Sequence, residues 1–108
     1  MHVELNNQVA IVTGGAHGIG QAIAHSLAAN GARVAIVDID GMAGERTAGK
    51  ISTAGGTCLA LNGDVSDPDQ MSRVVQQVQD QFGRIDILVN NAGINTRGDR
   101  APIHEYSL

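Results

Sequence analysis

Short apolar runs of strand type alternate along this chain with segments in which apolar residues recur at helical spacing. The runs predict four strands, at residues 8–13, 33–39, 58–61 and 85–89. The segments between them predict three helices, at about residues 18–30, 42–53 and 68–82. The first two strands are apolar almost throughout, which is typical of strands buried on both faces of a sheet.

The helix predicted at residues 68–82 has the clearest boundaries. Asp67 suits the capping position, Pro68 the first helical position, and Gln70 follows three residues after the cap. Gly83 ends the helix. One apolar stripe predicts the face that packs on the core, and it consists of Met71, Val74, Val75, Val78 and Phe82. The helix at residues 42–53 is less well specified, because Gly44 and Gly49 each cost roughly 1 kcal/mol relative to alanine.

This alternation predicts a single α/β domain over residues 1–108, with a doubly wound parallel sheet in the order 3-2-1-4. The polar segment at residues 94–108 is predicted as loop leading toward a helix. The sheet would then be truncated after its fourth strand, and Ile85, Ile87 and Val89 would lie on an unpaired edge. We expect such a chain to be marginally stable or to aggregate unless a partner or a longer chain completes the sheet.

Composition narrows the class of protein. The net charge is −4, which argues against a nucleic-acid-binding or anionic-membrane-binding surface. Cys58 is the single cysteine, so no internal disulfide forms, as in proteins of a reducing compartment. The first residues do not form a signal peptide, and no apolar stretch is long enough to cross a bilayer. These features predict a cytoplasmic protein without a metal site, because one cysteine and four scattered histidines make no ligand set.

The most informative segment joins the first strand to the first helix and reads V-A-I-V-T-G-G-A-H-G-I-G over residues 9–20. Its glycines permit a sharp turn and a close approach of the backbone to a ligand. The helix that follows directs free N–H groups and the positive end of its dipole toward a phosphate. The segment therefore predicts a site for the pyrophosphate of a dinucleotide.

An acid at the end of the second strand extends this prediction. Asp38 lies 18 residues after Gly20, near the spacing at which a carboxylate accepts hydrogen bonds from ribose hydroxyls. A carboxylate there would repel the 2′-phosphate of NADP, so the sequence favours NAD. The alternative is that Asp38 and Asp40 only end a strand in a solvated turn.

Three motifs in order give the chain a resemblance to the short-chain dehydrogenase/reductase family, and so to a Rossmann-type fold. They are the glycine loop at Thr13–Gly20, the pair Asp64-Val65 after the third strand, and Asn90–Gly93 after the fourth. The resemblance implies that Gly14, Gly18, Ile19 and Gly20 line the pyrophosphate, and that Asp64 and Val65 contact the adenine. It implies that Asn91, Ala92 and Gly93 border the adenosine ribose, while Asn90 braces the strands. His17 stands where NADP-preferring members often carry Arg or Lys, in agreement with Asp38.

The resemblance also implies a reaction, the interconversion of a secondary alcohol and a ketone by hydride transfer. The family uses a tyrosine, a lysine four residues later and a serine for proton transfer. No Tyr-x-x-x-Lys occurs here, and Tyr106 is the only tyrosine, so no residue is assigned a catalytic role and we expect no turnover from this chain alone. Family members are usually homo-oligomers, through helices that would follow Leu108. Two alternatives stay open, a non-catalytic nucleotide-binding module and an S-adenosylmethionine-dependent methyltransferase.

Overall fold

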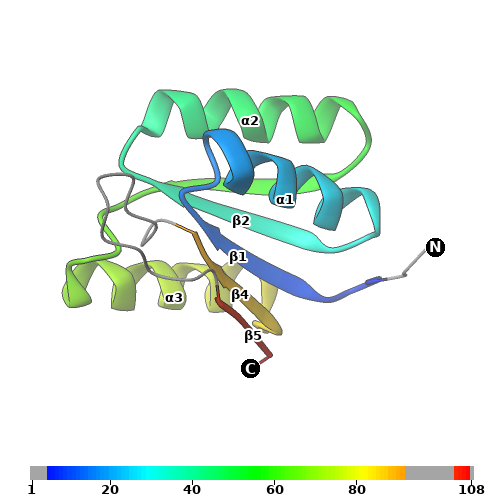
Figure 1. Cartoon of the computed structure of the whole chain (residues 1–108). Helices are drawn as coiled ribbons and strands as arrows, with labels where there is room; N and C mark the ends of the chain where they lie inside the picture. Colours follow the sequence, from blue (N-terminus) through cyan, green and yellow to red (C-terminus); the bar gives the residue numbers. More distant parts are fainter. Residues whose placement is uncertain (1–4, 92–103, 108) are drawn as a thin grey trace.

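A computed structural model describes residues 5–91 and 104–107 of the chain. Strands and helices alternate up to the fourth strand, and a fifth strand follows (Figure 1). In order, the elements are β1 (Val9–Thr13), α1 (Gly18–Ala29), β2 (Arg33–Asp38), α2 (Gly41–Thr53), β3 (Thr57–Asn62), α3 (Pro68–Phe82), β4 (Ile87–Asn90) and β5 (His104–Ser107). In the described part of the chain, no helix combines the length and the apolar character that a bilayer crossing needs.

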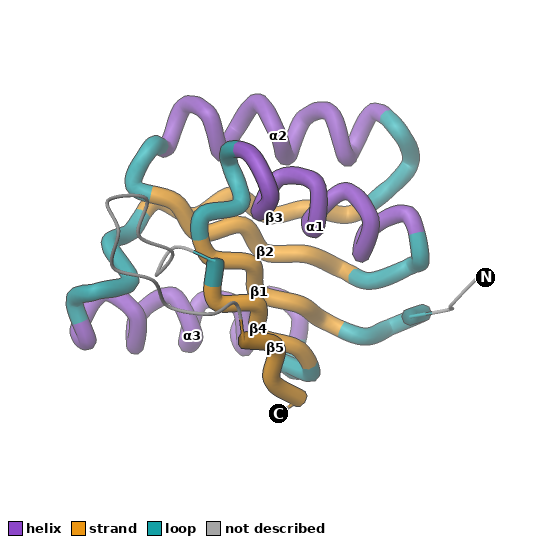
Figure 2. Tube along the Cα trace, viewed as in Figure 1, coloured by secondary structure: helices purple, strands orange, loops and turns teal. Residues whose placement is uncertain are grey.

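The predicted parallel order 3-2-1-4 is confirmed. The sheet has the order β3-β2-β1-β4-β5, and the first four strands are parallel. β1 lies in the middle, where Ile11 pairs with Ala35 of β2 on one side and with Leu88 of β4 on the other. Helices α1 and α2 cover one face of the sheet and α3 covers the opposite face (Figure 2).

Two apolar clusters, one on each face of the sheet, form the core. Val12, Val34 and Ile36 pack with Ala24 and Ile51 on the face of α1 and α2. On the face of α3, the cluster consists of Val9, Ile11, Ala35, Val37, Val74 and Val78. Successive residues of a strand point to opposite faces, so the consecutive apolar residues Val9–Val12 of β1 and Val34–Val37 of β2 serve both clusters. All five residues of β1 are buried.

The prediction that β4 is an unpaired edge is wrong. β5 pairs with β4 in antiparallel orientation, and the register joins Ile87 to Ser107 and Asn90 to His104. The prediction of loop for the whole segment 94–108 is therefore also wrong at residues 104–107. An antiparallel ladder is made by backbone groups, so a polar segment can supply it without a hydrophobic pattern that would predict it. The edges of the described sheet are instead β3 and β5.

α2 forms over its predicted length although it contains two glycines. Asp40 caps it by accepting a hydrogen bond from the N–H of Ala43 at 3.0 Å. The Gly44 position is buried, and a Cβ added there would lie 3.8 Å from Ala60 in β3, so this glycine sits where the helix approaches the sheet. Gly49, by contrast, is exposed, with no atom within 4 Å of an added Cβ.

These surroundings predict that Gly49→Ala stabilises the protein by about 0.5–1 kcal/mol, because alanine restricts the unfolded chain and favours the helix. Gly55→Ala is the control, since Gly55 is also open but has φ +95°, where alanine is strained. It should lower the free energy of unfolding. Urea unfolding of both variants checks this, and a destabilised Gly49→Ala would contradict the helical environment assigned to that position.

Candidate functional site

The candidate site lies where β1 and β4 end side by side. The buried hydroxyl of Thr13 lies 3.3 Å from the carbonyl of Val89 and 3.2 Å from Oδ1 of Asn90, and it accepts a hydrogen bond from the N–H of Asn91 at 2.9 Å. Nδ2 of Asn91 donates to the carbonyl of Gly14 at 3.3 Å. The loop after β1 and the loop after β4 are thereby brought together at the point where the strand order reverses, which is the ligand crevice of open α/β sheets.

Glycines shape the loop between β1 and α1. Gly14 has φ +66° and Gly18 has φ +54°, a conformation that glycine adopts without strain. A Cβ on Gly20 would lie 2.2 Å from the Gly14 carbonyl and 2.5 Å from Nδ2 of Asn91, so only glycine lets α1 begin this close to the strands. A Cβ on Gly15 would lie 2.8 Å from Ile36 in the core. Gly18 instead has no atom within 4 Å of an added Cβ and borders open space.

The N-terminus of α1 has no side-chain cap. His17 occupies the capping position, but its side chain makes no capping hydrogen bond, and the first turn holds no acidic residue. The first N–H groups of a helix have no partner within the helix, and they carry the positive end of its dipole. The structure therefore places Gly18, Ile19 and Gly20 at an uncapped helix start, which borders open space at Gly18.

Asp38 is held below this loop. Its Oδ2 accepts a hydrogen bond from the N–H of Ala16 at 3.1 Å, and its Oδ1 accepts one from the N–H of Asp40 at 2.9 Å. Each carboxylate oxygen can accept a further hydrogen bond. Asp38 is thus oriented by the glycine loop itself, which a strand end in a solvated turn would not require.

Asp40 has a different part in the structure. Its Oδ1 caps α2, and its Oδ2 lies 3.1 Å from Nε2 of His17, so the glycine loop and the start of α2 are in contact. The Ala43 N–H, followed by the His17 side chain, lowers the pKa of the Asp40 carboxyl. Both side chains of the His17–Asp40 pair are at least half exposed, so this contact contributes little to stability.

A hollow of about 340 Å³ opens beside Asp38. Residues from the ends of β1 and β2 and from the segment after β3 line it: Gly14, Val37, Asp38, Ile39, Gly63, Asp64, Val65 and Ser66. Oδ1 of Asp64 accepts hydrogen bonds from the hydroxyl of Ser66 at 2.6 Å and from its N–H at 2.9 Å, and these lower the pKa of the Asp64 carboxyl. The hollow thus combines a fixed carboxylate with apolar walls.

Sequence reasoning missed Ile39, Gly63 and Ser66. Ile39 is 70% exposed, next to Asp38 and outside the strand. Together with Ile19, which is 58% exposed, it is one of three large hydrophobic residues exposed in the described part of the chain. An isoleucine between two aspartates in a turn is the signal that could have identified this wall, because nothing local requires an apolar residue there.

The sequence also predicted Asn91, Ala92 and Gly93 as site residues. Asn91 lies at the site, and its Oδ1 is buried without a hydrogen-bond partner in the described residues, so the site holds an unsatisfied acceptor. Ala92 and Gly93 lie outside the described residues. Within residues 5–91 and 104–107, no three side chains of the His, Cys, Asp and Glu types come together as metal ligands.

Comparison with known proteins identifies the class. Residues 8–108 match the profile of the short chain dehydrogenase family, and the chain belongs to this family. It is 46% identical over 102 residues to galactitol 2-dehydrogenase of Agrobacterium fabrum, covering 94% of this chain and 38% of that protein. It is 44% identical over 97 residues to human 15-hydroxyprostaglandin dehydrogenase [NAD(+)], covering 88% of this chain and 36% of that protein.

Solved structures agree with this assignment. A citronellol catabolism dehydrogenase of Pseudomonas aeruginosa superposes with a TM-score of 0.80 at 34% identity, over 91% of this chain and 44% of that one. A hydroxysteroid dehydrogenase of Escherichia coli gives a TM-score of 0.81 at 36% identity, over 83% of this chain and 37% of that one. The chain therefore spans less than half the length of these relatives. Membership in this family excludes the interpretation of the chain as a methyltransferase.

The buried hydroxyl of Thr47 connects α2 to the glycine loop. Thr47 in α2 is 1% exposed, and its Oγ1 donates to the carbonyl of Ala16 at 3.4 Å and accepts from Nε2 of Gln21 at 3.2 Å. Thr47→Val keeps the shape of the side chain and removes both hydrogen bonds. We expect it to lower the free energy of unfolding by about 1–3 kcal/mol, because buried polar groups lose their partner.

Thr53→Val is the matched control for this prediction. Thr53 is in the same helix and is exposed, and its hydroxyl also binds a backbone carbonyl, that of Gly49 at 2.9 Å. Its replacement should change the free energy of unfolding by no more than about 0.5 kcal/mol. Chemical denaturation compares the two variants, and equal effects would show that Thr47 does not support the loop.

Proposed function

We propose that this chain is the NAD(H)-binding part of a short-chain dehydrogenase/reductase whose whole protein interconverts a secondary alcohol and a ketone. The observation that carries the proposal is the orientation of Asp38. Its carboxylate is held by two backbone N–H groups between the uncapped start of α1 and the hollow formed with the segment after β3. In this proposal the start of α1 would hold the phosphates, Asp38 the ribose hydroxyls and the hollow the adenine, which is the order of these parts in a dinucleotide.

Each part of the cofactor has residues that suit its chemistry. The pyrophosphate would lie at the α1 N-terminus against Gly18 and Ile19, where free N–H groups take the place of cationic side chains. The adenosine ribose would donate its hydroxyls to Asp38 and lie near Asn91. The adenine would enter the hollow between Ile39 and Val65, beside the Asp64 carboxylate. When bound, the nicotinamide ring would accept or donate the hydride of the reaction.

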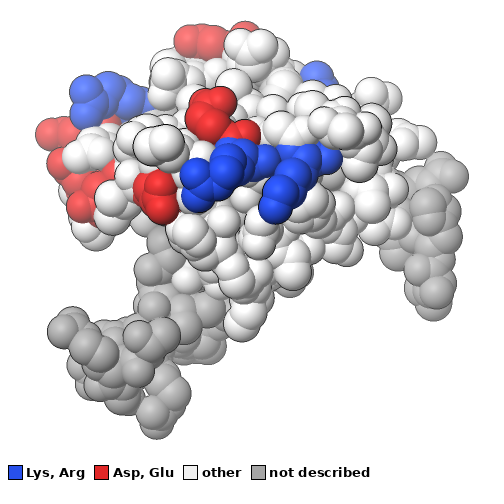
Figure 3. All heavy atoms as spheres, turned by 90° about the horizontal axis from the view of Figure 1, so that it is seen from above, with Lys and Arg blue, Asp and Glu red and all other residues white. Residues whose placement is uncertain are grey.

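The charges around the ribose position favour NAD over NADP. Two carboxylates, those of Asp38 and Asp40, stand at the end of β2 and the start of α2, and they would repel a 2′-phosphate. The face seen in Figure 3 shows a row of basic side chains with acidic side chains directly beside it. The relative named 15-hydroxyprostaglandin dehydrogenase [NAD(+)] supports this preference.

Binding measurements test the proposal. We expect NADH to bind at least tenfold more tightly than NADPH, a difference of about 1.4 kcal/mol. Asp38→Ala should narrow this ratio, because it removes both the acceptor for the ribose hydroxyls and the repulsion of the phosphate. Asp80→Ala is the matched control, since Asp80 is an exposed acid of α3 on the other face of the sheet. Isothermal titration calorimetry measures the affinities, and equal affinities of the unmodified protein for NADH and NADPH would contradict the role given to Asp38.

A further inference from the structure

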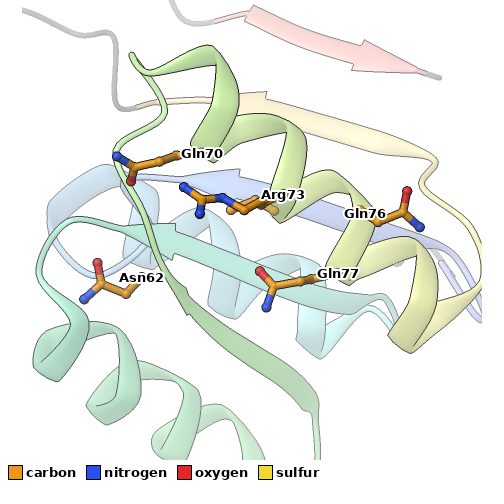
Figure 4. Close-up of a pocket in the computed structure, with 6 residues that line it drawn as sticks. Asn62, Gln70, Arg73, Gln76 and Gln77 are labelled. Carbon is orange, nitrogen blue, oxygen red and sulfur yellow. The ribbon is translucent and has the colours of Figure 1, made fainter.

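The side-chain amide of Gln70 makes a hydrogen bond that its position in the helix does not require. Gln70 lies in the first turn of α3, and its amide is directed toward the segment that leads from β3 into the helix (Figure 4). Its Oε1 accepts a hydrogen bond from the N–H of Asp64 at 2.8 Å. Its Nε2 donates to Oδ2 of Asp67, the capping residue, at 3.2 Å.

This arrangement departs from an ordinary capping box. In that motif the side chain three residues after the cap bonds back to the N–H of the capping residue itself. Here the N–H of Asp67 binds the carbonyl of Asp64 at 3.1 Å, and Asp67 caps the helix through Asp69 at 2.9 Å. Gln70 is therefore left to bind the N–H of Asp64, which belongs to the wall of the hollow rather than to the helix.

Asp64 is held from two directions as a result. Gln70 fixes its backbone, and Ser66 fixes its carboxylate through hydrogen bonds from the hydroxyl and the N–H group. Gly63 and Val65, its neighbours, line the same hollow. The position of the carboxylate relative to the hollow thus depends on a side chain that does not itself line the hollow.

We propose that Gln70 is a positioning residue for base recognition, and this inference rests on the proposed function. By fixing the backbone of Asp64, it directs the carboxylate to accept a hydrogen bond from the exocyclic amino group of a 6-aminopurine. A 6-oxopurine presents an acceptor at that place and is rejected, because two acceptors face each other without a proton between them. Gln70 thereby contributes to selection of the base without touching it.

The test compares NADH with its hypoxanthine analogue, which differs only in that base, by isothermal titration calorimetry. We expect the unmodified protein to prefer NADH. Gln70→Met keeps the length of the side chain and removes both hydrogen bonds. It should reduce the ratio of the two affinities about 3- to 10-fold, which corresponds to the contribution of one hydrogen bond.

Gln77→Met is the matched control. Gln70 and Gln77 both lie on α3 and line a groove beside Asn62, the last residue of β3. Gln77 is exposed and has no hydrogen-bond partner within the described residues. Its replacement should leave the preference unchanged. If Gln70 had a purely structural role, Gln70→Met would instead weaken the binding of both dinucleotides equally and leave the ratio of their affinities unchanged.

The outcomes separate the two proposals. If the unmodified protein binds neither dinucleotide, the proposed function fails and this inference fails with it. If it prefers NADH and Gln70→Met keeps the full preference, or if it shows no preference at all, only the role of Gln70 is overturned. Amide hydrogen exchange gives a ligand-free check: the Asp64 N–H should lose protection in Gln70→Met and keep it in Gln77→Met, and unchanged protection would also overturn the proposal.

Discussion

The site depends on the close approach of the carboxyl ends of β1 and β4. Thr13 joins them, because its buried hydroxyl lies against the end of β4 and accepts the N–H of Asn91. Asn91 in turn binds the Gly14 carbonyl, and the same space admits no side chain on Gly20. This packing sets where α1 begins, and hence where its free N–H groups point. A strand order with β1 in the middle is what makes such a junction possible.

Several acidic side chains of this negatively charged chain hold loops and helix starts in place by accepting backbone hydrogen bonds. Carboxylates of Asp38, Asp40, Asp64 and Asp67 each accept a backbone N–H in a loop or at a helix start near the carboxyl ends of the strands. At the opposite end of the sheet, Asp86 accepts the N–H of Val9 at 2.8 Å. Charge-assisted hydrogen bonds of this kind are stronger than neutral ones. Under the proposed function, a phosphate would therefore be held by backbone N–H groups, because the side chains near the proposed ribose position are acidic.

The hydrophobic pattern predicted the first four strands and three helices well, since each strand and helix must bury an apolar face. It was less informative where backbone groups or single contacts decide. β4 begins at Ile87 rather than residue 85, after Asp86 has bonded to β1 through both its N–H and its carboxylate. β5 could not be predicted, because a ladder with β4 needs backbone groups and no particular side chains.

The sequence by itself determined the alternation of elements and the family, because buried strands, glycine turns and helix caps each need particular residue types at short range. It also placed Asp38 near the end of the second strand, where β2 ends. Only the tertiary structure decided that Asp38 is oriented by Ala16, that Ile39 and Ser66 line the hollow, and that Gln70 supports Asp64. Hydrogen-bond direction and surface exposure decide these roles, and both depend on how loops from separate strands meet, which local pattern does not encode.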